Sequence, residues 1–276
     1  MGILNDEPNM AAPLISDMWE QGDPYELYVG RWSRRVAPQF LSWLNIPAGR
    51  RWLDVGCGTG ALSAALLDQC APSSLVSVEP SEGFLAMAKE QLGSTVLLRR
   101  GSAAEIPLDD RAVDVTVSGL VLNFVPNGRA AVSEMGRVTA PGGTIGAYVW
   151  DYSGKMEMIR YFWDAAVELD PEAAKLDEGV RFPVCRAAAL TELFANAGLR
   201  GAQVTAIDIK TTFANFEDYW RPFLGGQGPA PAYAMALDET ARARLADRIR
   251  ERLPLQADGS ISLTARAWAV RAAAAS

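Results

Sequence analysis

The segment Leu53–Gly60, Leu-Asp-Val-Gly-Cys-Gly-Thr-Gly, constrains the fold of this chain more than any other. An apolar run containing Asp54 is followed by three alternating glycines, Gly56, Gly58 and Gly60, and the next residues have a helical pattern. A strand that turns through glycine into a helix brings bare backbone and the positive end of a helix close to a ligand. The segment therefore predicts a strand, a ligand-binding turn and a helix, in that order.

Strand and helix patterns alternate on both sides of this turn, up to about residue 150. Strands are expected at 51–55, 75–78, 95–98, 113–117 and 144–150, and helices at 61–67, 82–92 and 129–138. Further along, helices are expected at 156–170, 190–197 and 238–253, and strands at 203–209 and 261–270. Such alternation is typical of a parallel sheet with helices on both sides. We therefore expect an α/β fold with a Rossmann-like, seven-stranded, mostly parallel sheet, helices on both faces and an added helical lid.

Charge and composition exclude several classes of function. The chain has 26 basic and 33 acidic residues, a net charge of −7, which disfavours a nucleic-acid partner because phosphate-tracking proteins usually carry a basic excess or stripe. It has no histidine, which excludes histidine bases, triads and metal ligands, and its three cysteines lack metal-ligand spacing, so no metal site is expected. The few cysteines, and the lack of a long apolar run or a basic leader, predict a soluble, cytoplasmic protein without a membrane partner.

Four further segments follow the glycine turn in order. They are Glu79 at the end of the second expected strand, Gly101–Pro107, Ser118–Val125, and Glu134–Val138 leading to Pro141-Gly142-Gly143. Together with Leu53–Gly60, they resemble the motifs of class I S-adenosylmethionine-dependent methyltransferases, especially the enzymes of ubiquinone and menaquinone biosynthesis and other small-molecule methyltransferases. The resemblance covers about residues 50–150 and implies S-adenosylmethionine as the cofactor.

The resemblance also assigns cofactor contacts to individual residues. Asp54 is expected to help hold the amino end of the cofactor, and Glu79 to accept hydrogen bonds from both ribose hydroxyls. Ser102 stands where relatives often carry an aspartate that meets the adenine amino group, so recognition of adenine is expected to lean also on the backbone of Ala103. The full expected set is Tyr25, Arg31, Asp54, Gly56, Cys57, Gly58, Gly60, Glu79, Pro80, Ser102, Ala103 and Leu120.

Segments outside the minimal fold are expected to cover the cofactor. In related enzymes an N-terminal helix with aromatic residues folds over the cofactor, which would place Tyr25 or Tyr28 near the sulfonium and Arg31 near the carboxylate. Aromatic residues also recur in the second half of the chain, in segments that commonly form a substrate lid in this superfamily. We expect a single methyltransferase domain over 1–276, with an N-terminal helical cap at 1–45 and inserted lid segments at 151–186 and 211–255.

Methyl transfer from a sulfonium is an in-line displacement that depends on alignment and exclusion of water, so the lack of histidine does not prevent it. Asn123 is expected at the carboxyl end of the fourth strand, beside the transferring methyl group. Asp151 and Tyr152, just past the fifth strand, are candidate bases, although an amine, thiol or acidic phenol would need no base. Asn123, Asp151 and Tyr152 are therefore the candidate catalytic residues.

The expected function is methyl transfer to a small-molecule acceptor, an aromatic or apolar metabolite. An RNA or protein methyltransferase, an NAD(P)-dependent oxidoreductase and a catalytically silent cofactor-binding protein are the alternatives. Gly56-x-Gly58-x-x-Ala61 also fits the NAD or FAD fingerprint, and Glu79 supports both cofactors equally. An oxidoreductase would need a proton relay, and the nearest candidate, Tyr152-x-x-Lys155, has two intervening residues instead of three. The acceptor atom, the pathway and the oligomeric state are not fixed by these patterns.

Overall fold

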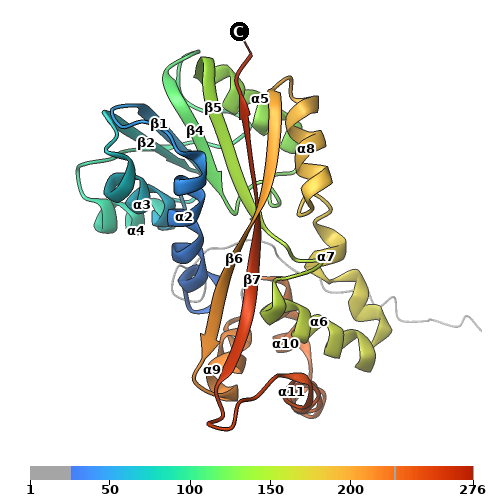
Figure 1. Cartoon of the computed structure of the whole chain (residues 1–276). Helices are drawn as coiled ribbons and strands as arrows, with labels where there is room; N and C mark the ends of the chain where they lie inside the picture. The colour runs from blue at the N-terminus through green and yellow to red at the C-terminus, as the bar shows by residue number, and fades with distance from the viewer. Residues whose placement is uncertain (1–25, 227, 276) are drawn as a thin grey trace, which may run out of the picture.

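The computed structural model describes residues 26–226 and 228–275, and it is built on one seven-stranded sheet (Figure 1). The strands are β1 (Arg51–Val55), β2 (Ser74–Glu79), β3 (Leu97–Arg100), β4 (Val113–Gly119), β5 (Thr139–Trp150), β6 (Arg200–Phe213) and β7 (Ile261–Ala273). Their order is β3-β2-β1-β4-β5-β7-β6, and β7 runs antiparallel to both of its neighbours while the other pairs are parallel. The predicted seven-stranded, mostly parallel α/β sheet is confirmed.

Helices cover both faces of the sheet for a topological reason. The chain moves along the sheet in one direction from β1 to β2 and in the other from β4 to β5, so right-handed crossovers place the intervening helices on opposite faces. Figure 1 shows one group formed by α2 (Arg31–Leu44), α3 (Ala61–Cys70) and α4 (Glu82–Leu92). The other group is formed by α5 (Gly128–Val138) and α8 (Ala187–Asn196), which pack on each other. Because both faces are covered, a central strand such as β4 is buried through most of its length.

The last two strands extend past the carboxyl end of β5. Trp150, the last residue of β5, pairs with Ala267, whereas the pairing of β6 with β7 continues to Phe213 and Ile261. The helices around this ribbon are η1 (Glu26–Gly30), α6 (Glu157–Leu169), η2 (Pro171–Lys175), α7 (Glu178–Arg181), α9 (Phe216–Trp220), η3 (Arg221–Gly225), α10 (Pro229–Ala236) and α11 (Glu239–Arg252). We call this group the cap. It contains the helices of the two segments expected to form a lid, and its lid role stays a prediction.

Aromatic stacking holds the cap together. Phe162 of α6 stacks on Phe223 of η3 with ring centroids 4.6 Å apart, and Tyr28 of η1 meets Phe223 edge-on at 5.4 Å. These rings are fully or almost fully buried, so the aromatic residues of the second half of the chain form a core of their own. None of the helices in the described residues is both long and apolar enough to cross a membrane.

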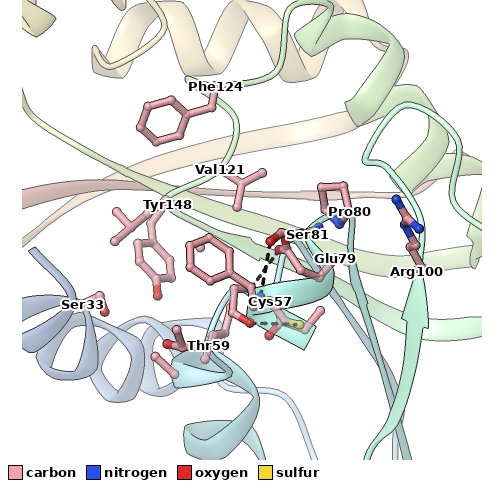
Figure 2. Close-up of a pocket in the computed structure, with 18 of the residues that line it drawn as sticks. Ser33, Cys57, Thr59, Glu79, Pro80, Ser81, Arg100, Val121, Phe124 and Tyr148 are labelled. Carbon is pink, nitrogen blue, oxygen red and sulfur yellow. Dashed lines mark hydrogen bonds between the residues drawn. The ribbon is translucent and has the colours of Figure 1, made fainter. Parts of the chain in front are cut away.

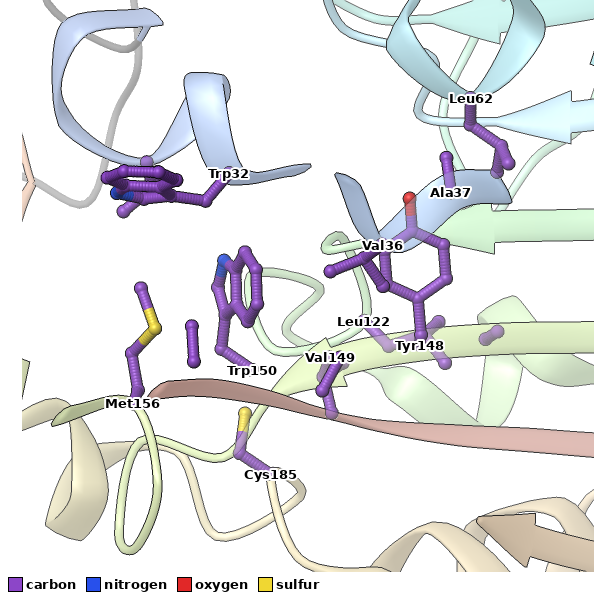
Figure 3. Packing of buried hydrophobic residues seen from close by; sticks show 14 of the residues in the cluster. Trp32, Val36, Ala37, Leu62, Leu122, Tyr148, Val149, Trp150, Met156 and Cys185 are labelled. Atoms are coloured by element: carbon purple, nitrogen blue, oxygen red, sulfur yellow. The ribbon is translucent and has the colours of Figure 1, made fainter. Parts of the chain in front are cut away.

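Helix α2 joins the cap to the sheet. Trp32 and Val36 of α2 lie beside Tyr148 and Trp150 of β5, and all four side chains are buried (Figure 3). Tyr148 and Trp150 are two residues apart on one strand, so their side chains leave the same face of the sheet. The buried surface that these side chains form therefore continues from the sheet to the contact between α2 and the cap.

Candidate functional site

A cavity of about 670 Å³ opens at the carboxyl ends of the parallel strands, where open α/β sheets bind their ligands. Its lining comprises Ser33, Asp54, Gly56, Cys57, Gly58, Thr59, Ala61, Leu62, Glu79, Pro80, Ser81, Glu82, Phe84, Arg100, Gly119, Leu120, Val121, Phe124 and Tyr148. Figure 2 shows Pro80 and Arg100 on one side of this space and Tyr148 and Ser33 on the other. The cavity therefore runs from the β2–β3 side, past the glycine turn, to the β4–β5 side.

The glycine turn forms the middle of the cavity floor. Gly56, Gly58 and Gly60 have φ angles of 73°, 54° and 95°, in the left-handed region that other residues rarely adopt. A β-carbon on Gly56 would lie 2.5 Å from a methyl group of Val121, whereas one on Gly58 would meet no protein atom within 4 Å. Since Gly58 lines the cavity, the space above it is open for a ligand rather than filled by the protein.

Glu79 stands at the tip of β2 and is fixed by backbone groups. Its carboxylate accepts hydrogen bonds from the Gly58 N–H at 3.0 Å and from the Ser81 N–H at 3.0 Å. Burial raises the pKa of Glu79, and these two hydrogen bonds oppose that shift. A carboxylate has about four acceptor positions, so Glu79 retains acceptor capacity toward the cavity after binding the turn.

Asp54, at the end of β1, is fully buried and only partly satisfied. One carboxylate oxygen accepts a hydrogen bond from Ser63 Oγ at 2.6 Å, while Oδ1 has no partner among the described residues. Burial raises the pKa of Asp54 to about 7, and the hydrogen bond from Ser63 partly offsets this effect. An orphaned carboxylate oxygen beside a ligand-sized cavity is suited to a hydrogen-bond donor or a cation on the ligand.

The opposite wall is built from the ends of β4 and β5. A β-carbon on Gly119 would lie 2.6 Å from the phenol oxygen of Tyr148, so Tyr148 can occupy its place only beside a glycine. Leu120 has a φ of 62°, unusual for a non-glycine residue, and its N–H donates to the Tyr148 carbonyl at 2.8 Å. Strained backbone of this kind tends to occur at functional sites.

The expected adenine contacts lie outside the cavity lining. Ser102 is exposed, and its Oγ accepts a hydrogen bond from the Glu105 N–H at 3.1 Å, while Ala103 is buried. In their place Arg100 lines this side of the cavity and pairs with Glu82. The cofactor roles expected for Ser102 and Ala103 stay predictions.

The remaining expected contacts divide into three groups. Asp54, Gly56, Cys57, Gly58, Glu79, Pro80 and Leu120 line the cavity, and Gly60 ends the turn as the N-cap of α3. Arg31 does not line it: its guanidinium pairs with Asp218 of α9 at 3.1 Å and lies over the Phe213 ring. Tyr25 falls outside the described residues.

The three candidate catalytic residues are buried but absent from the cavity lining. The Asp151 carboxylate accepts the Lys155 N–H at 3.0 Å and so stabilises the turn after β5, and the Tyr152 ring packs against Phe182. Neither amide atom of Asn123 has a partner among the described residues. Their catalytic roles stay predictions.

Sequence reasoning did not select several residues that line the cavity, notably Ser33, Thr59, Phe84, Arg100, Phe124 and Tyr148. Tyr148 lies in an expected strand, but an all-apolar run does not show which side chains face a ligand. Ser33 comes from α2, far from the glycine turn in sequence, and no local pattern links the two. No group of three or more acidic or cysteine residues that could hold a metal ion occurs in 26–226 or 228–275.

Comparison with known proteins shows which family this site belongs to. Residues 53–147 match the family model of a methyltransferase domain. Over these residues the chain is similar to a methyltransferase domain. The predicted resemblance is confirmed over this segment, which contains the glycine turn, Glu79 and β4 and ends one residue before Tyr148.

Curated methyltransferases match about two fifths of this chain. An uncharacterised methyltransferase of Mycobacterium tuberculosis is 39% identical over 114 residues, which are 41% of this chain and 45% of that protein. A demethylmenaquinone methyltransferase of Staphylococcus aureus is 35% identical over 117 residues, 41% of this chain and 47% of that protein. The match thus spans about half the length of these relatives.

Solved structures share the fold over a longer stretch. A putative methyltransferase of Bacillus halodurans has a TM-score of 0.58 at 15% identity, covering 87% of this chain and 99% of that one. Phosphoethanolamine N-methyltransferase 2 of Haemonchus contortus, solved with S-adenosylmethionine, has a TM-score of 0.56 at 14% identity, covering 91% and 57%. A (4+2)-cyclase has a TM-score of 0.53 at 18% identity, covering 88% and 81%. Because proteins named for different reactions share this fold, the fold by itself does not define the chemistry.

Proposed function

We propose that this protein transfers the methyl group of S-adenosylmethionine to a small-molecule acceptor. The observation that carries the proposal is the pairing of two buried carboxylates in one cavity on either side of an open glycine turn. Asp54 offers an oxygen without a partner, and Glu79 is held by backbone N–H groups with acceptor capacity to spare. A cofactor with a cationic amino group at one end and a ribose diol further along would satisfy both.

The residues present fit such a cofactor. Glu79 would accept from the ribose hydroxyls, as an acid at the tip of the second strand does in nucleotide-binding sheets. Asp54 would hold the amino group. Gly58 leaves open space for the ligand, and the apolar side chains of Phe84 and Leu120 would pack on its two ends.

When bound, the cofactor supplies a methyl group that is already activated by a positively charged sulfur. The chain then has to align an acceptor with that methyl group and exclude water, which can contribute roughly 7–11 kcal/mol to lowering the barrier. Val121, Phe124 and Tyr148 wall the β4–β5 side of the cavity and suit this task.

The charge pattern of α11 supports a small acceptor over RNA. Arg248 and Arg252 both pair with Glu168 of α6, and Arg250 pairs with Asp247 and lies over the Phe216 ring. Arginines that are paired within the protein do not form the basic stripe that tracks a phosphate backbone.

Calorimetry tests the proposal directly. The full chain is titrated with S-adenosylmethionine, its demethylated product and NAD, and we expect heat from the first two only. Glu79→Gln should weaken binding by about 10- to 100-fold, because hydrogen bonds to a charged group contribute about 1.5–3 kcal/mol. Glu82→Gln is the matched control, because Glu82 lines the same cavity but is exposed and already paired with Arg100.

Two outcomes would contradict the proposal. One is heat with NAD and none with S-adenosylmethionine. The other is a Glu79→Gln variant that binds as tightly as the parent chain. A labelled-methyl assay with phenols, amines, thiols, carboxylates and transcribed RNA then identifies the acceptor class.

A further inference from the structure

The charged side chains that line the cavity lie at its centre and on its β2–β3 side. They are Asp54 of β1, Glu79 of β2, Glu82 of α4 and Arg100 of β3. The described residues on the other side are Ser33 of α2, Gly119, Leu120, Val121 and Phe124 of β4 and the loop after it, and Tyr148 of β5. None of these six is charged, and Figure 2 shows Tyr148, Ser33 and Phe124 turned away from the Arg100 side.

The uncharged side is where an acceptor would meet the methyl group. If Glu79 holds the ribose, the adenine end points toward β3 and the sulfonium end toward β4 and β5, because β2 lies between β3 and β1 in the sheet. This step rests on the proposed function. The acceptor half of the cavity is therefore uncharged, and its polar side-chain groups among the described residues are the hydroxyls of Tyr148, Ser33 and Thr59.

The uncharged side of the cavity discriminates between acceptors by their charge. A cationic acceptor would enter beside the positive sulfonium, and no described carboxylate on that side offsets the repulsion and the loss of water. An acceptor with a phosphate or carboxylate on its body would bury that anion without a cation to pair it. An uncharged, apolar acceptor meets neither cost.

The same wall offers no proton acceptor. At the centre, Asp54 is taken by the amino group of the cofactor under the proposed function, and Cys57 is a thiol whose pKa is raised by burial, so it stays protonated. On the uncharged side, the Tyr148 phenol is a weak base. The acceptor must then lose its own proton to water before it reacts. Thiols and acidic phenols do so near neutral pH.

Two buried indole groups continue the wall outward. Trp150 lies two residues beyond Tyr148 on β5, and Trp32 adjoins Ser33 on α2 (Figure 3). Neither indole N–H has a hydrogen-bond partner among the described residues. Because neither tryptophan lines the cavity, these indoles add apolar packing behind the lining residues and do not themselves select the acceptor.

We propose that the methyl acceptor is an uncharged, apolar molecule carrying a thiol or an acidic phenol, and that the enzyme uses no protein base. The acceptor proton leaves to water first. The sulfur or oxygen then bonds to the methyl carbon, and the bond from that carbon to the sulfonium breaks with its electron pair staying on the cofactor sulfur. The products are the methylated acceptor and the neutral demethylated cofactor. This class excludes phosphoethanolamine, the amine in the name of the Haemonchus contortus enzyme with the same fold.

Three arylthiols with the same nucleophile test the charge selection. Thiophenol, 4-mercaptobenzoate and 4-(aminomethyl)thiophenol present an uncharged, an anionic and a cationic body, and labelled methyl transfer gives kcat/KM for each. We expect thiophenol to be preferred over both charged probes by about tenfold or more. Its rate should rise with pH along the ionisation of the thiol itself.

A substitution that adds charge to the wall sharpens the test. Ser33→Asp places a carboxylate on the acceptor side and should shift the preference toward the aminomethyl probe. Ser42→Asp is the matched control, because Ser42 lies on the same helix, also donates to a carbonyl of its own turn, and is exposed. Calorimetry with S-adenosylmethionine on each variant reports whether the cofactor site is intact.

The outcomes separate this inference from the proposed function. If the parent chain does not bind S-adenosylmethionine, the proposed function is overturned. With cofactor binding intact, equal use of the three probes, a preference for a charged one, or no transfer to any arylthiol or acidic phenol would overturn the inference alone. A rate that follows a group other than the thiol would show that a protein base takes part.

Discussion

Cofactor binding should depend on pH through Asp54. This carboxyl group has a pKa of about 7 in the free protein because it is buried, and its Oδ1 has no partner. If the amino group of the cofactor binds the ionised form only, the observed affinity scales with the ionised fraction. That fraction is about 0.09 at pH 6 and about 0.9 at pH 8 for a pKa of about 7, so the affinity should rise about tenfold, or about 1.4 kcal/mol.

Calorimetry in buffers of different ionisation enthalpy measures both the affinity and the protons released. At pH 7 we expect about half a proton to be released for each cofactor bound, and more at pH 6. Asp54→Asn should weaken binding and flatten its pH dependence, because Asn cannot ionise and still accepts from Ser63. Asp114→Asn is the control, because Asp114 lies outside this cavity. The hydrogen bond from Arg51 lowers the pKa of Asp114, so this carboxyl group does not titrate near pH 7.

The same group should destabilise the free protein at high pH. Its folded pKa is above the value of 3.8 for an unfolded chain, so the contribution of Asp54 to stability is fully present below about pH 4 and is lost as the pH rises through about 7. The shift corresponds to about 4 kcal/mol, which Asp54→Asn should largely remove from the pH dependence of urea unfolding. An affinity that is constant from pH 6 to 8, or proton uptake on binding, would refute the reasoning.

Three substitutions test the packing of the site and the cap. Gly58→Ala should cost about 1–2 kcal/mol of stability because of its positive φ, and it should also weaken cofactor binding. Gly49→Ala is the control, because Gly49 has a positive φ and equally open surroundings but lies away from the cavity, so it should cost stability alone. Urea unfolding measures the stability and calorimetry the affinity, and equal affinities of the two variants for the cofactor would contradict the prediction. Gly119→Ala should displace the phenol of Tyr148 and cost about 1–3 kcal/mol in urea unfolding, so an unchanged midpoint would show that the wall is not tightly packed. Asp177→Ala removes the carboxylate 2.7 Å from the largely buried guanidinium of Arg160, which keeps the exposed Asp164 at 3.3 Å as a carboxylate partner, and should cost about 3–5 kcal/mol of unfolding free energy. A loss below 1 kcal/mol would show that the pair behaves as an exposed one.

Local patterns predicted the elements that position the cofactor half of the site. The alternation of strand and helix patterns predicted all seven strands, because a sheet covered on both faces needs apolar runs separated by helices. The glycine turn and Glu79 could be read directly, since each is a short-range consequence of backbone geometry at a strand end. Their assignment to a methyltransferase domain is confirmed by the family match over 53–147.

Contacts between distant segments could not be read in this way. Arg31 was expected near the cofactor carboxylate, yet its guanidinium pairs with Asp218, 187 residues away. Ser102 was expected near adenine, yet its hydroxyl accepts a hydrogen bond from the backbone of its own turn. A side chain takes the partner that the fold brings near, and neither partner is visible from the residues around it.

The sequence alone determined that a strand, a glycine turn and a helix would bring backbone close to a ligand, because left-handed φ angles are a property of glycine itself. Only the tertiary structure decided what surrounds that turn. It placed Tyr148 against Gly119, left one oxygen of Asp54 without a partner, and kept charged lining residues off the β4–β5 side of the cavity. These features depend on strand order and on α2 crossing over the sheet, and packing of that kind arises between segments far apart in the chain.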